Sequence, residues 1–273
     1  MVCTERVAQP KKMAARRLII RSWIGWVSWK PEARWDLTGV SVGAYADVRP
    51  WRMPDVIPHL TVLKPRRPNV VFVDWAGTMS HSMFWSRWKE SAPARWQRVQ
   101  RSLFGDPKLV RDWMRGRHAA EEIVEMLATG DDLPIDGWAA ELERSCCEMQ
   151  LVDASIPGLL AALRSIGVKV VIATDNMDTF SRWTVPSLGL LELVDEVLDS
   201  SRLGCLKADR DPSGRSPFFH SWFEAHGVRP SESVLFDDGG QHAEEIGIAW
   251  VPVTPDKPLA PALAALLDVI RAG

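Results

Sequence analysis

Residues 70–78 read VVFVDWAGT, and this stretch changes from a continuous apolar run to polar residues at Asp74. Two later stretches have the same form: residues 168–174 read VKVVIAT, and residues 233–238 read SVLFDD. Short apolar runs without alternation are typical of strands that are buried on both faces of a parallel sheet. The sequence therefore predicts three strands of this kind, each followed by polar residues.

Helical patterns lie between and after these runs. Leu159, Leu160, Leu163 and Ile166 form one apolar helix face, and Gly167 is placed to end that helix. We expect two further helices at residues 218–226 and 258–270. Because strands alternate with helices, the predicted fold class is α/β, with a doubly wound parallel sheet.

Polar side chains at the strand ends form the candidate site. Asp74, Thr174 and Asp238 follow apolar runs, and parallel sheets bind ligands at the carboxyl ends of their strands. One such residue is also ordinary turn chemistry, so the prediction rests on all three together. A carboxylate can act as a nucleophile, and Asp237 with Asp238 offers the hard oxygen ligands that Mg²⁺ prefers. The Thr174 hydroxyl and Lys207 can bind phosphoryl oxygens.

These residues resemble the motifs of the haloacid dehalogenase (HAD) superfamily of hydrolases. The first motif, D-x-x-G-T, matches residues 74–78; the second is a Ser or Thr that ends a strand, matched by Thr174; the third is a Lys, matched in residues 207–209, KAD; the fourth is an acidic pair, matched by residues 237–238. The resemblance covers about residues 69–256. It implies a Rossmann-like core at 69–78 and 152–273, with a helical cap at 79–151 inserted after the first strand.

The resemblance also implies roles for individual residues. Asp74 would be the nucleophile and a Mg²⁺ ligand, together with Asp237, Asp238 and the backbone carbonyl of Ala76. Thr174 and Lys207 would hold the phosphoryl group and the nucleophile. The remaining candidates lie beside these motifs. Substrate binding is expected at Gly77, Thr78, Asp175 and Asn176, although the last two also suit a helix N-cap.

One residue departs from the family pattern. Most phosphatases of the superfamily carry a second Asp where this chain has Ala76, and that Asp acts as general acid and base. The variant DWAGT is similar to the first motif of phosphonoacetaldehyde hydrolase, which cleaves a C–P bond through a Schiff base on a cap lysine. Lys89 and Lys108 are the lysines available in the insertion, and His81 is a candidate for the missing acid; a surface or loop position is the alternative for each.

The insertion carries helical patterns of its own. Ala120, Ile123, Val124 and Leu127 fit one helix face, and the spacing of Trp85, Trp88 and Trp96 predicts another helix with core tryptophans. A set of arginines is interpreted either as a substrate clamp or as a solvated helix face: Arg87, Arg95, Arg98, Arg111, Arg115 and Arg117. His242 lies four residues after Asp238 and is a candidate for an indirect role, in which it contacts residues of the site rather than the substrate.

Composition limits the class of partner. The 273 residues carry a net charge of −2, which gives no case for binding nucleic acid. The basic residues 1–68 are rich in Trp and Pro and are interpreted as an extension or linker, with a stretch that lies on a membrane surface as the alternative. Their apolar run is too short to span a membrane. None of the four cysteines forms a C-x-x-C pair, which favours a reducing, cytoplasmic location.

The predicted function is a Mg²⁺-dependent phosphatase that acts on a small phosphorylated compound through an aspartyl-phosphate intermediate. Two alternatives remain open. One is hydrolysis of a C–P or C–halogen bond by the same nucleophile, and the other is a catalytically weak protein that binds a phosphorylated ligand or a partner. The sequence predicts no oligomeric state.

Overall fold

The computed structural model describes residues 67–272, and the predicted N-terminal extension therefore lies almost wholly outside the described residues. The described chain forms a five-stranded sheet in the order β3-β2-β1-β4-β5, and all pairings are parallel. The strands are β1 (Val70–Val73), β2 (Lys169–Thr174), β3 (Glu196–Asp199), β4 (Ser233–Asp237) and β5 (Ala249–Pro252). This confirms the predicted α/β class with a parallel sheet.

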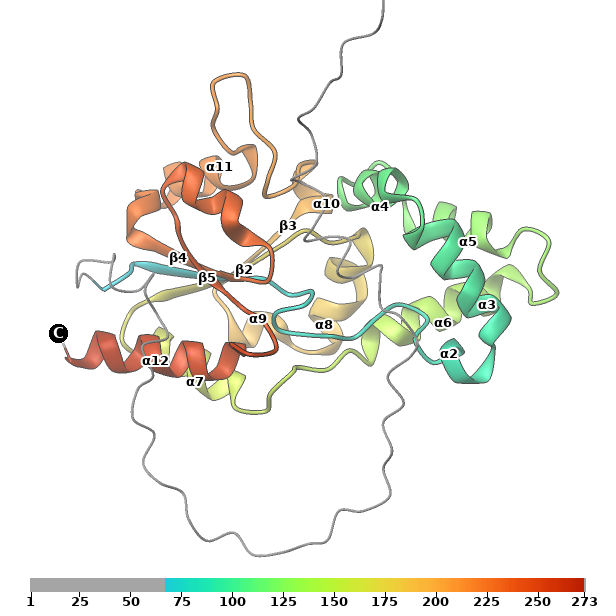
Figure 1. Ribbon diagram of the computed structural model, residues 1–273, viewed down its shortest axis with the longest axis horizontal. Coiled ribbons are helices and arrows are strands. Elements are labelled where there is room, and N and C mark those ends of the chain that lie inside the picture. The colour runs from blue at the N-terminus through green and yellow to red at the C-terminus, as the bar shows by residue number, and fades with distance from the viewer. Residues whose placement is uncertain (1–66, 273) are drawn as a thin grey trace, which may run out of the picture. The chain divides into compact units, whose positions relative to one another are not determined.

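The central strand β1 is apolar on both faces because both faces are covered. Val71 and Val73 belong to one core cluster, which includes side chains of α7 (Ile156–Ser165) and α12 (Leu259–Ala272). Val70 and Phe72 belong to a second cluster, built mainly with aromatic residues of α11 (Pro217–His226). Figure 1 shows α7 and α12 on one side of the sheet and α11 on the other. Alternate residues of one strand thus supply two cores.

The chain between β1 and α7 is helical. It contains α2 (Trp88–Ser91), α3 (Pro93–Val99), α4 (Pro107–Met114), α5 (Ala120–Ala128) and α6 (Ile135–Cys147). In Figure 1 these helices form a group beside the sheet. They fall within the range predicted for a cap, and the division into core and cap stays a prediction.

Three short helices follow β2 and β3. They are α8 (Val185–Ser187), α9 (Leu190–Leu193) and α10 (Ser200–Leu203). No helix among residues 67–272 is both long and apolar enough to cross a membrane.

One sequence prediction in the insertion is wrong. Trp85, Trp88 and Trp96 do not share a helix: Trp85 precedes α2 with a φ of 52°, Trp88 begins α2, and Trp96 lies on α3. Pro93 starts a new helix because it cannot donate a backbone hydrogen bond within the preceding one. The expectation that these are core residues is confirmed for Trp85 and Trp88, which are buried.

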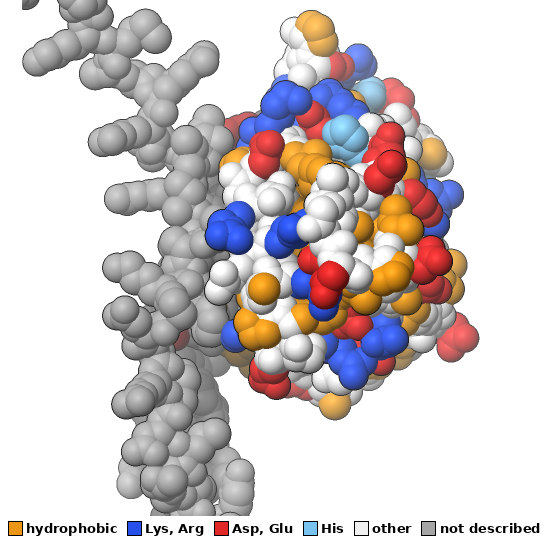
Figure 2. Space-filling model, turned by 90° about the vertical axis from the view of Figure 1, so that its right-hand side faces the viewer, with side chains coloured by type: hydrophobic (Ala, Val, Ile, Leu, Met, Phe, Trp, Pro, Cys, Tyr) orange, Lys and Arg blue, Asp and Glu red, His pale blue; other side chains and the backbone are white. Residues whose placement is uncertain are grey.

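The far end of the insertion has a mixed surface. In Figure 2, Lys and Arg side chains are interspersed with Asp and Glu side chains over this face. The insertion contains several ion pairs, among them Arg95 with Asp131 at 2.8 Å and Arg117 with Asp112 at 2.6 Å.

Candidate active site

The register of the sheet brings the first and fourth motifs together. Val73 of β1 lies opposite Phe236 of β4, and the amide of Asp74 donates to the carbonyl of Phe236 at 2.9 Å. Asp74 and Asp237 therefore leave neighbouring strands at the same level. One ligand oxygen from each of Asp74, Asp237 and Asp238 lies within 4.8 Å of the other two. Asp74 and Asp237 are buried, whereas Asp238 is exposed.

Lys207 reaches this group from the loop after α10. Its Nζ lies 3.0 Å from Oδ1 of Asp74 and 2.5 Å from Oδ2 of Asp237, and only 3% of the residue is exposed. The two carboxylates outweigh the cost of burying the ammonium, so the pKa of Lys207 is raised and the side chain stays charged. The expected Lys is thus in place, although the next helix, α11, begins only at Pro217.

Charge in this group favours a bound cation. Burial raises the pKa of Asp74 well above its ordinary value, and Asp237 with Asp238 raises it further, against the opposing effect of Lys207. Three carboxylates and one ammonium carry a net negative charge when ionised, which would repel a phosphate ester. Oxygen ligands of this type and number fit Mg²⁺, which would offset that charge. The donor set therefore fits the metal that the motifs predict.

Thr174 supplies a buried hydroxyl at the end of β2, the strand next to β1. The residue is fully buried, and its Oγ1 has no hydrogen-bond partner among residues 67–272. The hydroxyl of Thr78 is also buried and has no hydrogen-bond partner among these residues. A buried hydroxyl without a partner is costly, and a bound phosphoryl oxygen would remove that cost. Both residues therefore fit the binding roles expected of them.

The loop after Asp74 is held by its own backbone. Gly77 has a φ of 78°, and its amide donates to the carbonyl of Ser80 at 2.8 Å. The Gly77 amide is therefore engaged within the loop, and its role is to permit the turn. Among the described residues, the amides of Trp75 and Ala76 donate no backbone hydrogen bond in this loop. Ala76 can offer the metal only its backbone carbonyl.

Asp175 and Asn176 connect loops of the site. Oδ1 of Asp175 accepts from the amide of Lys207 at 2.9 Å, and the amide of Asn176 donates to Oγ of Ser200 at 2.9 Å. Burial raises the pKa of Asp175 to about 6. Asp175 thus braces the Lys207 loop from the β2 side, which the N-cap interpretation did not foresee. Direct contact of either residue with substrate stays a prediction.

The two candidate histidines differ in environment. His81 is exposed and lines a cavity of about 560 Å³ together with Gly77 and Thr78. His242 is half-buried; burial, and then the charge of Lys207, lowers its pKa to about 4. His242 is therefore neutral near pH 7, and the structure places it in the surroundings of Lys207 and Asp237.

The lysines proposed for a Schiff base lie on the surface. Lys89 and Lys108 are both exposed, and Nζ of Lys108 pairs with Asp112 at 2.6 Å. A Schiff-base lysine must lose its proton in a protected site, and neither position offers such surroundings.

One pair of residues beside the site was not predicted from the sequence. Arg115 of the insertion makes two hydrogen bonds to Asp209, from Nε at 3.0 Å and from Nη2 at 2.6 Å. In the sequence, Asp209 is the last residue of the third motif, KAD, and Arg115 is one of several arginines that were interpreted together. A separation of 94 residues leaves no sequence signal for such a pair.

Comparison with known proteins places the fold. No family model and no curated protein matches the sequence. Solved structures do match. A predicted HAD-like hydrolase from Porphyromonas gingivalis has a TM-score of 0.56 and 19% identity, covering 74% of this chain and 98% of its own. A HAD family enzyme from Bacteroides thetaiotaomicron, in complex with magnesium and inorganic phosphate, has a TM-score of 0.54 and 14% identity, covering 71% and 98%.

A dehalogenase is also similar. L-2-haloacid dehalogenase from Xanthobacter autotrophicus has a TM-score of 0.51 and 15% identity, covering 72% of this chain and 86% of its own. At these identities the likeness concerns the fold, and the known structures that share it include both magnesium-binding and dehalogenating enzymes. The resemblance seen in the motifs is confirmed at that level: this protein has the fold of the HAD hydrolases.

Proposed function

We propose that the protein is a Mg²⁺-dependent phosphatase that acts on a small phosphorylated compound. The observation that carries this proposal is the group of three carboxylates, Asp74, Asp237 and Asp238, within 4.8 Å of one another beside the buried Lys207. Such a group would repel an anionic substrate without a cation and would bind one well with it. The magnesium and phosphate complex of the Bacteroides enzyme supports the same chemistry.

Asp74 is the proposed nucleophile. In the first step, one carboxylate oxygen of Asp74 forms a bond to phosphorus while the bond from phosphorus to the leaving-group oxygen breaks. In the second step, water attacks phosphorus, the Asp74 oxygen leaves, and inorganic phosphate is released; the proton that this water gives up balances the one that the leaving-group oxygen takes from solvent. Lys207 neutralises charge on Asp74, and Thr174 donates a hydrogen bond to a phosphoryl oxygen. A metal held by Asp74, Asp237, Asp238 and the Ala76 carbonyl would offset the negative charge of the ester.

The test is turnover of a panel of phosphate esters with Mg²⁺. Replacing Asp74 by Asn removes the nucleophile with almost no change in volume, so we expect turnover to fall to background. Asp256→Asn is a matched control because Asp256 is exposed in the loop after β5. Equal activity of Asp74→Asn and the wild-type protein would show that the proposed nucleophile is wrong.

A second candidate function is supported by Ala76. Without a side-chain acid at this position the protein could bind a phosphorylated ligand and turn it over poorly. In that case the same esters with Mg²⁺ would raise the melting temperature of the wild-type protein without releasing phosphate. The exposed positions of Lys89 and Lys108 give less support to C–P cleavage through a Schiff base. Trapping with phosphonoacetaldehyde and borohydride tests that route directly.

A further inference from the structure

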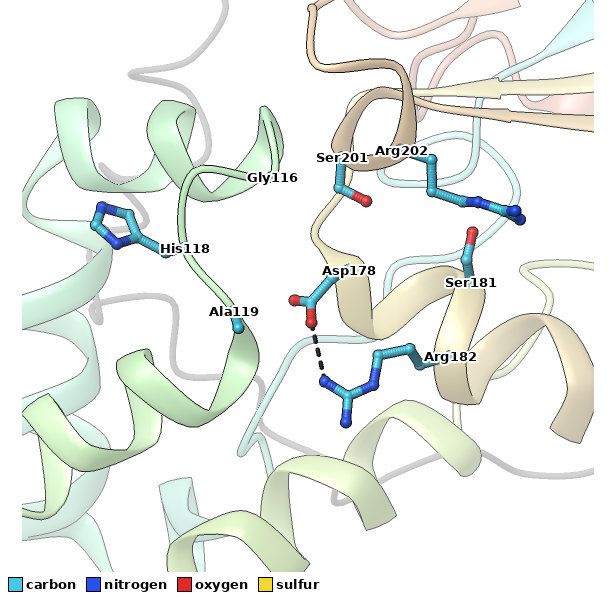
Figure 3. Close-up of a pocket in the computed structure, with 8 residues that line it drawn as sticks. All are labelled: Gly116, His118, Ala119, Asp178, Ser181, Arg182, Ser201 and Arg202. Atoms are coloured by element: carbon cyan, nitrogen blue, oxygen red, sulfur yellow. Dashed lines mark hydrogen bonds and ion pairs between the residues drawn. The ribbon is translucent and has the colours of Figure 1, made fainter.

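The end of α4 and the residues before α5 (113–119) form a corner of the insertion. This corner contacts the segments that follow two core strands. Trp113 donates its ring N–H to Asp178, after β2, at 2.7 Å, and the carbonyl of Met114 accepts from Ser200, after β3, at 2.7 Å. Gly116 comes so close to Ser201 that an added Cβ would lie 2.2 Å from the Ser201 carbonyl oxygen. Figure 3 shows this corner facing Asp178 and Ser201 across a small cavity.

The same corner also contacts the loop that carries Lys207. Arg115 lies between Met114 and Gly116, and both of its hydrogen bonds to Asp209 use the planar end of the guanidinium. The pair is only partly accessible, with side-chain exposures of 18% for Arg115 and 30% for Asp209. Bidentate pairs of this type fix orientation as well as distance.

Asp209 passes this restraint on to the backbone next to Lys207. Its Oδ2 accepts from the amide of Leu206 at 2.9 Å and is also the oxygen that accepts from Nε of Arg115. On the other side, the amide of Lys207 donates to Asp175. The loop is therefore held from the insertion through Asp209 and from β2 through Asp175, with the Lys207 ammonium placed between Asp74 and Asp237.

We propose that Arg115 is a positioning residue for Lys207: by binding Asp209 it holds the Lys207 loop in the geometry that the active site needs. The catalytic meaning of this role rests on the phosphatase proposed above. It replaces both earlier interpretations of Arg115. The Nε and Nη2 edge of the guanidinium is held by Asp209 rather than by a substrate, and the side chain is only 18% exposed.

A polar cavity lies beside this corner. The cavity at the corner, about 390 Å³, is lined by polar groups, including Asp178, Arg182 and Ser201. In Figure 3 the Asp178–Arg182 pair lies on the core side and His118 points away from it.

The first measurement is hydrogen exchange of the peptide that contains residues 204–209, followed by mass spectrometry on the full chain. Arg115→Met keeps an unbranched apolar stem and removes the hydrogen bonds, so we expect severalfold faster exchange of the Leu206 and Lys207 amides. Arg115→Lys should be intermediate. Arg182→Met is the matched control because Arg182 pairs with Glu121 and Asp178 at the same corner and has no contact with Asp209.

The second measurement is turnover of p-nitrophenyl phosphate with Mg²⁺. A displaced Lys207 should lower kcat about 10- to 100-fold with little change in KM, because small misplacements of a catalytic group are costly. A clamp on the substrate would instead raise KM, and that result would overturn the proposal. In the Asp209→Asn background, Arg115→Met should have no further effect, because both changes remove one interaction.

Gly116→Ala tests the same restraint without touching Arg115. The added methyl group meets the Ser201 carbonyl, and φ at Gly116 is 66°, so the corner must shift. We expect faster exchange at residues 204–209 here too.

Each failure is separable from the other. If wild-type protein hydrolyses esters but Arg115→Met changes neither exchange nor kcat, the positioning role is wrong and the phosphatase stands. If no ester is hydrolysed but exchange rises in Arg115→Met and not in Arg182→Met, the phosphatase is wrong and the restraint on the Lys207 loop stands.

Discussion

Ala76 carries only a methyl group two residues after the proposed nucleophile, so its side chain can give no proton to a departing oxygen. The cost of this absence depends on the leaving group. A phenolate such as p-nitrophenolate departs without a proton, whereas an alkoxide needs one. Because of Ala76, we therefore expect the rate of hydrolysis to depend on the leaving group of the ester.

Ala76→Asp should raise the rate on alkyl phosphates by about 10- to 100-fold, since general acid help is typically worth that much or more. The rate on p-nitrophenyl phosphate should change little. Steady-state kinetics on the two esters provides the comparison, with Ala76→Asn as a control that has the same size and no acid. A fall in both rates with Asp would mean that the site is built for another reaction.

Asp175 makes stability depend on pH. Its folded pKa of about 6 lies above the ordinary 3.8, because burial opposes the charged form. As pH rises from about 4 to 6, the unfolded chain gives up this proton first, so stability is lost across that interval and stays lost above it. Asn has no proton to lose and can still accept from the Lys207 amide.

We therefore expect Asp175→Asn to be more stable than wild type at pH 8 by about 1–2 kcal/mol, with the difference gone near pH 3, below the ordinary pKa of 3.8. Urea unfolding in the presence of EDTA at the two pH values measures this. A difference that is equal at both would point to packing and would rule out titration as its cause.

At the scale of elements, β1 and α11 depend on one aromatic cluster. Phe72 is fully buried, and its ring centre lies 5.2 Å from that of Phe219, 5.1 Å from Trp222 and 5.8 Å from Phe223. All three contacts are edge-to-face, the geometry that aromatic rings prefer.

Phe72→Ala should lower the free energy of unfolding by about 3–5 kcal/mol, because it leaves a cavity between sheet and helix. Phe72→Leu should lower it by less, since much of the volume is kept. Urea denaturation measures both. Similar losses for the two variants would mean that ring geometry, rather than volume, sets the stability here.

The elements also show what the sequence could predict. β1, β2 and β4 have apolar runs because both of their faces are buried. β3 and β5 read EVLD and AWVP, and their burial is incomplete. Four-residue edge strands with mixed composition carry no pattern that separates them from loops, so both were missed. The three longest helices of the core, α7, α11 and α12, were found close to their observed bounds because each has an apolar face and a clear start or end signal; the short helices α8, α9 and α10 were missed.

The site was predictable to the extent that it lies at strand ends. Asp74 directly follows a buried strand, and Thr174 and Asp237 each end one. The parallel register brings these strand ends to the same edge of the sheet. The restraint by Arg115 was not predictable, because it depends on how the insertion folds back over the core. Long-range contacts of this kind leave no local pattern.

For the whole molecule, the three clustered carboxylates should affect the melting temperature in opposite directions with and without bound metal. Mg²⁺ should raise the melting temperature of the wild-type protein, because a ligand that binds only the folded state stabilises it, by about 2.7 kcal/mol at one hundred times its Kd. Asp238→Asn should remove most of this gain, whereas Asp256→Asn should keep it.

In EDTA the same Asp238→Asn change should raise the melting temperature slightly, since it relieves repulsion with Asp74 and Asp237. Differential scanning fluorimetry with EDTA or Mg²⁺ gives both results. A melting temperature that ignores Mg²⁺ in the wild type would contradict the proposed metal site.

The order of strands also bears on how the chain is made. β1 occupies the middle of the sheet, yet its neighbours β2 and β4 come after the whole helical insertion: Val70 pairs with Lys169 on one side and with Ser233 on the other. During synthesis this apolar strand leaves the ribosome long before either neighbour exists. A sheet whose strands pair over such long sequence separations folds slowly and exposes apolar surface while it folds. The nascent protein should therefore be a client of chaperones until β4 has emerged.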